Sequence, residues 1–285
     1  DREGCFWYPQ GKMKTLPPRD RITLCLVLCL LLSPFTAQAF DVKGLQPLSP
    51  YGVFSSFSAE SLPHKSVGIG LGVERSMEPH FYRTTLQMAY GLHDKVEINA
   101  SLPYVINWGE SLCGAEDLSI GLKHRVLDET KYTPAVAYML TASVPFGRNE
   151  FSTDGSYGGG LLVTKKVGPF KGHLNLLYSN PGKAELHDEY SMNLGAELAV
   201  SHNSKILAEL VGRKNYFMNK IDLLEWRLGY RVATRDYLFT SVGVGFDIKE
   251  REPHYRFLVT VGIILPPARK DVRRIYEESP SMISP

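Results

Sequence analysis

Charged residues of both signs recur at alternate positions in the second half of the chain. In the segment 221–232, alternate positions carry Glu225, Arg227 and Arg231. In the preceding segment, 204–214, they carry Glu209 and Arg213. Alternate residues of a β-strand point to the same face, so these side chains could meet inside a closed sheet. Charges in a narrow pore decide which solutes pass, because the field there is poorly screened. We predict a lumen-lining constriction that comprises Glu97, Lys123, Arg125, Glu197, Glu209, Arg213, Glu225, Arg227 and Arg231.

Glycines occupy the same polar parity near both ends of the strand-rich region. Gly68, Gly70 and Gly72 alternate near its start, and Gly243 and Gly245 alternate near its end. In a closed sheet the first and last strands are neighbours, so these residues would form one glycine wall of the lumen. We expect open space beside this wall. The alternative is that the glycines permit sharp curvature while the charges pair and fill the lumen, which would give a plugged structural barrel.

Residue types suited to nucleophilic catalysis also occur. A hydrolytic triad needs Ser, His and an acid or amide held together, and residues 187–191 and 202–204 supply these types. Both groups lie in predicted loops or turns, where such residues serve turn chemistry. We therefore predict no catalytic residues, and an outer-membrane lipid hydrolase remains the less favoured alternative. The sequence has no metal-ligand spacing, P-loop or dinucleotide fingerprint, so we expect no metal, cofactor or nucleic-acid partner.

The elements that must position these residues are strands. Apolar and polar residues alternate almost everywhere from Lys65 onward, as in Leu118, Ile120 and Leu122 against the residues between them. Most segments are roughly 10 to 13 residues long, which suits a tilted strand that crosses a membrane. The sequence predicts an all-β, closed antiparallel transmembrane β-barrel of about twelve strands. The segments lie near 65–75, 80–91, 94–106, 117–127, 132–146, 157–167, 170–179, 190–200, 204–214, 221–232, 236–246 and 253–265.

The connections alternate in length. Those at 91–94, 168–169, 201–204 and 234–235 are tight, whereas those at 107–116, 147–156 and 180–189 are longer. Outer-membrane barrels have short periplasmic turns and long extracellular loops. We therefore place the short turns and both ends of the barrel on the periplasmic side.

The start of the chain has the pattern of an export signal. A basic stretch after Met13 precedes an apolar run over 22–32, and Ala37-Gln38-Ala39 forms an A-x-A cleavage site, which predicts cleavage after Ala39. The chain of 285 residues has 22% charged and 44% hydrophobic residues, unlike a disordered chain or a helical membrane protein. We predict an extension and signal peptide (1–39), a periplasmic or plug-like segment (40–64), the barrel (65–265) and a polar periplasmic tail (266–285).

Three motifs resemble one family. Residues 90–97 (YGLHDKVE) with 102–104 (LPY), 114–123 (GAEDLSIGLK) and 143–147 (SVPFG) are similar to elements of the outer-membrane "MetA-pathway of phenol degradation" family. The similarity covers roughly residues 45 to 265. It implies an outer-membrane transporter of aromatic or other poorly soluble compounds and brings no catalytic residues. We expect the bacterial outer membrane as the location, and the bilayer, the outer-membrane assembly machinery and a small-molecule solute as partners. The predicted function is a porin-like channel for passive uptake.

Overall fold

The computed structural model describes residues 44–77, 81–106, 112–214, 223–248 and 255–266. The predicted signal peptide and nearly all of the predicted tail lie outside these residues. No helix in the described part of the chain is long and apolar enough to cross a membrane. The strands are β1 (Val67–Ser76), β2 (Phe81–His93), β3 (Val96–Ile106), β4 (Cys113–Ala115), β5 (Leu118–Leu127), β6 (Ala135–Val144), β7 (Ser156–Val167), β8 (Phe170–Pro181), β9 (Glu189–Ser201), β10 (Ser204–Lys214), β11 (Leu223–Arg235), β12 (Leu238–Asp247) and β13 (Tyr255–Leu265).

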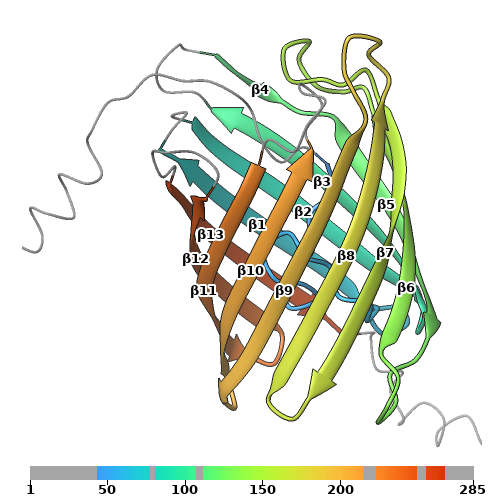
Figure 1. Cartoon of the computed structure of the whole chain (residues 1–285), viewed down its shortest axis with the longest axis vertical. Coiled ribbons are helices and arrows are strands. Elements are labelled where there is room, and N and C mark those ends of the chain that lie inside the picture. The colour runs from blue at the N-terminus through green and yellow to red at the C-terminus, as the bar shows by residue number, and fades with distance from the viewer. Residues whose placement is uncertain (1–43, 78–80, 107–111, 215–222, 249–254, 267–285) are drawn as a thin grey trace, which may run out of the picture. The chain divides into compact units, whose positions relative to one another are not determined.

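Twelve of these strands form a closed antiparallel barrel (Figure 1). Each long strand pairs with its neighbour in the chain, and β1 closes the barrel by pairing with β13 along its whole length, from Val67 opposite Leu265 to Ser76 opposite Arg256. β4 is additional, because it pairs only with the last residues of β3. It lies in the stretch 107–116 that we expected to be a loop. The predicted fold class is therefore confirmed, and β4 is the one strand that the sequence analysis missed.

The outer face of the barrel is apolar along every strand. Leu71 is 51% exposed, Leu228 is 46% exposed and Val259 is 43% exposed. On the opposite parity, the side chains of Glu209 and Arg227 are buried. A soluble barrel buries its apolar side chains and exposes its charged ones. The opposite distribution in this barrel fits a wall that faces lipid.

The two ends of the barrel differ as expected. One end has five strand connections. Four of them are two residues long, at 94–95, 168–169, 202–203 and 236–237, and the fifth comprises residues 128–134. At the other end the connections include residues 145–155 and 182–188. We call these the turn end and the loop end. β1 starts at the turn end, and β13 finishes there.

The depth of lipid-facing residues in the bilayer can be tested with one residue at the centre of a strand and one at its end. We expect Leu228→Arg, at the middle of β11, to lower the free energy of unfolding by about 2 to 4 kcal/mol, because a charge at the bilayer midplane is poorly solvated. Val167→Arg, at the last residue of β7, should cost about 0 to 1 kcal/mol near the interface. Urea unfolding in lipid vesicles measures both. Equal losses for the two variants would contradict the depth assignment.

Candidate functional site

The lumen is occupied by the segment that precedes β1. Residues 44–66, here called the ring segment, lie inside the barrel (blue in Figure 1), and most of residues 47–63 are buried. The segment begins beside β3 and β5, reaches β1 at Leu48, and from there passes the remaining strands on its way back to β5 and β3. The wall residues that it meets are Ser101 of β3, Gly121 of β5, Gly68 of β1, Gly262 of β13, Gly243 of β12, Arg231 of β11, Glu209 of β10, Gly195 of β9, Asn175 of β8, Thr164 of β7, Lys123 of β5 and Glu97 of β3.

Side chains of the wall satisfy the backbone of the ring segment. The segment has one isolated bridge, between Gly52 and Phe57, and a few turn hydrogen bonds such as that from the Ser58 amide to the Tyr51 carbonyl. Its remaining buried backbone groups need partners elsewhere. Asn175 accepts from the Phe57 amide at 2.6 Å and donates to the Phe57 carbonyl at 2.9 Å. Thr164 accepts from the Ala59 amide at 2.8 Å, and Glu97 accepts from the Leu62 amide at 2.7 Å. The wall therefore takes the place of a neighbouring strand.

A buried ion network fixes the middle of the ring segment. One oxygen of Glu209 accepts from the amides of Ser55 and Ser56 at 2.9 and 2.5 Å. Arg227 lies 3.2 Å from Glu209 and 2.8 Å from Glu225, and it also donates to the Ser55 hydroxyl. Buried charges persist only when they are paired and hydrogen-bonded, and here the ring segment supplies part of that pairing.

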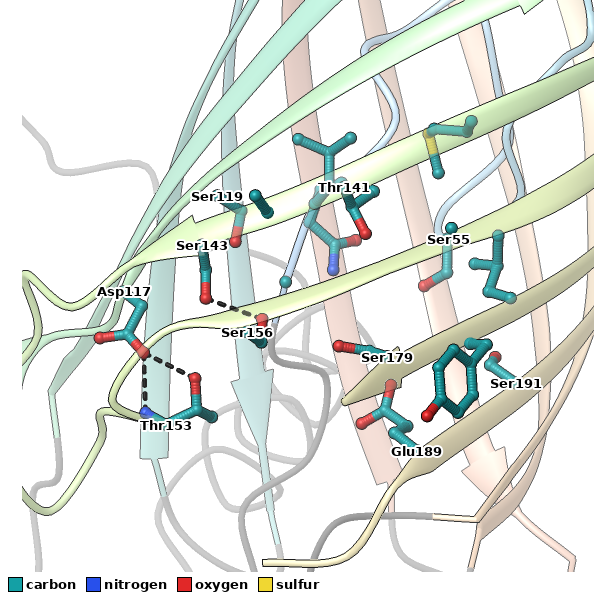
Figure 2. Close-up of a pocket in the computed structure, with 18 of the residues that line it drawn as sticks. Ser55, Asp117, Ser119, Thr141, Ser143, Thr153, Ser156, Ser179, Glu189 and Ser191 are labelled. Atoms are coloured by element: carbon teal, nitrogen blue, oxygen red, sulfur yellow. Dashed lines mark hydrogen bonds between the residues drawn. The ribbon is translucent and has the colours of Figure 1, made fainter. Parts of the chain in front are cut away.

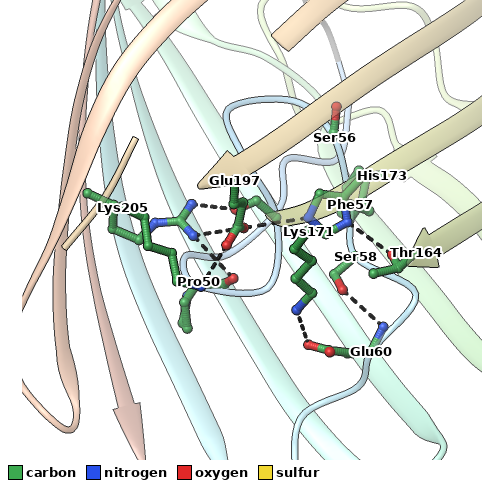
Figure 3. A network of polar contacts seen from close by, with 12 residues as sticks. Pro50, Ser56, Phe57, Ser58, Glu60, Thr164, Lys171, His173, Glu197 and Lys205 are labelled. Carbon is green, nitrogen blue, oxygen red and sulfur yellow. Dashed lines mark hydrogen bonds and ion pairs between the residues drawn. The ribbon is translucent and has the colours of Figure 1, made fainter. Parts of the chain in front are cut away.

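A second network surrounds Glu197 (Figure 3). Glu197 lies 2.7 Å from Lys205, 3.1 Å from Arg231 and 3.6 Å from His173. Arg231 also donates to the Gly52 carbonyl. Arg231 thus joins a carboxylate of the wall to the backbone of the ring segment.

The other predicted charges are divided between the lumen and its ends. Lys123 pairs with Glu97 at 3.1 Å and donates to the carbonyl of Glu60 at 2.7 Å. Arg213 faces Glu189 at 3.6 Å. Arg125 does not join these groups, because it lies at the turn end beside Asp128, 3.1 Å away. The role of the set as a solute constriction remains a prediction.

Sequence reasoning missed several wall residues that hold the ring segment. Asn175, His173 and Lys171 share the inward parity of β8, and Lys171 pairs with Glu60 of the ring segment at 2.5 Å (Figure 3). The signal was the run of polar residues at alternate positions in the predicted strand 170–179. That run gave no sign that its partners would be backbone groups.

The glycine wall lies against the ring segment. A Cβ atom at Gly68 would sit 2.1 Å from Leu48 Cδ2, and one at Gly70 would sit 2.6 Å from Leu48 Cδ1. At Gly243 it would meet Phe54 Cζ at 2.3 Å. The space that we expected to be open therefore holds Leu48 and Phe54. The two remaining members differ. A Cβ atom at Gly245 would meet Glu225, and one at Gly72 would have its nearest neighbours in Gln87 and Thr85, at 3.8 and 3.9 Å.

A cavity, here called the vestibule, lies in the lumen toward the loop end. Its space is about 850 Å³, part of it open to solvent, and Leu45 and Phe57 of the ring segment contribute to its lining. Hydroxyl groups from neighbouring strands converge on it (Figure 2), and Met139 and Leu177 supply apolar surface. The labelled hydroxyl residues of the wall are Ser119, Thr141, Ser143, Ser156, Ser179 and Ser191.

The charged groups of the vestibule already have partners. Both oxygens of Glu116 accept from Arg83, at 2.6 and 2.5 Å. Asp117 accepts from the amide and the hydroxyl of Thr153, each at 2.7 Å, and from the Gly147 amide at 3.2 Å. Burial raises the pKa of Asp117, but hydrogen bonds from Ser152, Thr153 and Gly147 outweigh it, so the pKa lies below its usual value. Some of the hydroxyls are also paired, as Ser143 is with Ser156 at 2.7 Å.

The residues considered for a hydrolase do not come together as a triad. Ser191 donates to Asn193 at 2.7 Å, and Ser204 contacts Ser201 at 2.6 Å. Among the described residues, neither hydroxyl is hydrogen-bonded to a histidine.

Comparisons with known proteins identify the fold. No protein-family model matches the chain, and no curated protein matches it. An outer membrane channel from Pseudomonas putida F1 is similar with a TM-score of 0.59 at 13% identity, over 73% of this chain and 98% of that chain. The KdgM porin has a TM-score of 0.53 at 10% identity, over 69% and 98%. The NanC porin has a TM-score of 0.53 at 8% identity, over 68% and 98%. At these identities the likeness shows that the chain has the fold of outer-membrane barrels.

The ion network predicts an asymmetric response to substitution. We expect Arg227→Met to lower the free energy of unfolding by about 3 to 5 kcal/mol, because Glu209 would stay buried without the arginine that pairs with it and Glu225 would lose the nearer of its arginines and keep Arg256, at 3.6 Å. Lys95→Met removes an ion pair with Asp128 that is about half exposed, so it should cost less than about 1 kcal/mol. Urea unfolding of the two variants gives the comparison. A loss below about 1 kcal/mol for Arg227→Met would show that the network is not needed for stability.

The contact of Asp117 with the loop after β6 predicts a pH dependence. The pKa of Asp117 is lowered in the folded protein, so its stabilising effect is complete above the unfolded value of about 3.9. That effect is lost as the pH falls through the folded pKa. Hydrogen exchange of the Thr153 amide, corrected for the intrinsic rate, should be constant above about pH 5 and should accelerate in more acidic solution. In Asp117→Asn the acid-induced change should disappear, and an unchanged profile in that variant would contradict the assignment.

Proposed function

We propose that this protein is an outer-membrane channel for the passive uptake of small solutes. The observation that carries the proposal is the vestibule, a solvent-connected cavity within a closed barrel whose outer face is apolar. The fold shared with an outer membrane channel and two porins supports it. The predicted signal peptide and the lipid-facing wall together favour location in the bacterial outer membrane, after assembly by the machinery for such barrels. No step of the proposed function needs a cofactor or a catalytic group.

The lining of the vestibule favours small, uncharged, amphipathic solutes. Its carboxylates are paired or hydrogen-bonded, as for Glu116 with Arg83, whereas hydroxyls and the apolar side chains of Met139 and Leu177 face the cavity. A solute with one hydrogen-bonding group on an apolar body fits such a surface. The resemblance to the "MetA-pathway of phenol degradation" family favours aromatic or hydrophobic compounds within this class.

A structural barrel is the second candidate, and the burial of the ring segment favours it. Leu48, Phe57 and Leu62 are each less than 5% exposed, so the lumen is filled at their level. The two candidates differ in one property, which is whether ions and solutes cross the barrel. Conductance of the purified protein in a planar bilayer with KCl distinguishes them. Discrete current steps support the channel, and their absence supports the structural barrel.

Narrowing the vestibule tests whether it is on the transport path. Thr141→Trp places a large side chain in the vestibule, and we expect it to lower KCl conductance at least twofold. Leu140→Trp is the matched control, because Leu140 is the preceding residue of β6, is 56% exposed and faces outward. Aromatic side chains are tolerated on the lipid side. Equal conductance of the two variants would remove the vestibule from the path.

A further inference from the structure

The two halves of the ring segment are attached to the wall by different kinds of contact. Residues 44–51 have long hydrogen bonds to the wall: Ser101 to the Gly44 carbonyl at 3.2 Å, Ser49 with Ser241 at 3.4 Å, and Arg231 to the Pro50 carbonyl at 3.4 Å. A hydrogen bond from the Ser58 amide to the Tyr51 carbonyl connects them to the other half, at the junction of the two. Their closest contacts are apolar. Leu45 packs against Gly121, and Leu48 packs against Gly68 and Gly70.

Residues 52–62 are held by buried polar groups at short range. Glu209 accepts from the amides of Ser55 and Ser56, and Asn175 makes two hydrogen bonds to Phe57, all at distances between 2.5 and 2.9 Å. Release of this half would leave Glu209 and Arg227 without part of their pairing. Release of the first half would break no bond to a carboxylate.

The first half also separates two spaces in the lumen. Gln46 contributes to the lining of the vestibule, and it also lines a smaller cavity of about 410 Å³ on the side of β1, β2 and β13. The smaller cavity is bounded by Gly72, Thr85 and Gln87. Gln46 therefore stands between the vestibule and the strand that carries Gly68, Gly70 and Gly72.

We propose that residues 44–51 are a gate that swings away from the glycine wall, while residues 52–62 stay in place as its frame. The proposal rests on the proposed channel function. Movement of the gate would join the vestibule to the smaller cavity and free the strip beside Gly68 and Gly70. Because these glycines carry no side chains, departure of Leu48 leaves a clear strip along β1. Leu48 is held by apolar contacts, so its departure separates no ion pair. The gate can therefore open and close again.

Two engineered disulfides test the proposal in the full-length protein. Cys113 is a free thiol, and Cys5, Cys25 and Cys29 precede the predicted cleavage site, so both are made on Cys113→Ser with these three cysteines also replaced by Ser. In the gate lock, Ser49→Cys is combined with Gly262→Cys, where a new Cβ atom would lie 3.5 Å from the Ser49 Cβ, within the range of disulfides. In the frame lock, Ser56→Cys is combined with Gly195→Cys, where the corresponding distance is 3.0 Å. Both sites need small shifts of the chain. The new Cβ atom at Gly262 also approaches the Ser49 carbonyl oxygen at 2.7 Å, and the 3.0 Å at the frame lock is shorter than the separation of about 3.5 to 4.5 Å in disulfides.

The readout is KCl conductance before and after oxidation. We expect the oxidised gate lock to lose at least nine tenths of its conductance and to regain it with dithiothreitol. The oxidised frame lock should conduct as its reduced form does. If both oxidised locks conduct normally, transport does not need the gate to move. If both close, the whole ring segment moves. Either result overturns the proposal and leaves the channel intact. If the reduced proteins and the wild type all fail to conduct, the channel function itself fails and the gate with it.

A second pair of variants avoids any new covalent bond. Leu48→Ala removes the apolar contact of the gate with Gly68 and Gly70, and it should raise the open probability several-fold. Val53→Ala is the matched control in the frame, where Val53 packs against Gly195, and it should leave the open probability unchanged. Heat-modifiable gel mobility verifies that both are folded. Equal open probabilities in the two variants would contradict the division of the ring segment into gate and frame.

Discussion

The backbone of the ring segment needs hydrogen-bond partners inside a closed wall, and the arrangement of the lumen depends on this need. A buried amide or carbonyl without a partner costs about 1 to 3 kcal/mol. The last residues of the segment, Lys65 and Ser66, exchange backbone hydrogen bonds with a strand, at Gly91 of β2. Elsewhere the wall presents Asn175, Thr164, Glu97 and Glu209 at the heights where the amides of the segment point. The inward face of the barrel is therefore a set of hydrogen-bond acceptors and counter-ions made for one particular path of the chain.

The same constraint accounts for the charges and the glycines together. Glu209 has Arg227 and two amides of the ring segment as partners, so its burial depends on both the wall and the segment. A twelve-stranded barrel lies between filled eight-stranded barrels and open sixteen-stranded ones. The ring segment approaches parts of the wall closely. Gly68, Gly70 and Gly243 make the wall thin where Leu48 and Phe54 approach.

The vestibule and the ring segment's contacts with the charged residues of the wall lie at different levels of the barrel. The vestibule has hydroxyl and apolar lining, with its carboxylates already in use. Toward the turn end, the ring segment occupies the lumen, and its polar contacts with the wall are short in one half and long in the other. A channel of this design would select solutes at the loop end and control passage within the lumen. That division differs from a single charged constriction, because here the charges mainly hold the chain that occupies the lumen.

The sequence by itself determined the wall. Period-two alternation is a local property, so strand positions, the two parities and the difference between turns and loops could be predicted from neighbouring residues. It also placed Glu209, Arg227 and Gly68 on the inward face. Only the tertiary structure decided what those residues contact. Residues 40–64 show no alternation, and Ser55 and Phe57 meet the wall through backbone amides, which carry no side-chain signature. Their partners come from strands far along the chain, and closure of the barrel brings them to the same level.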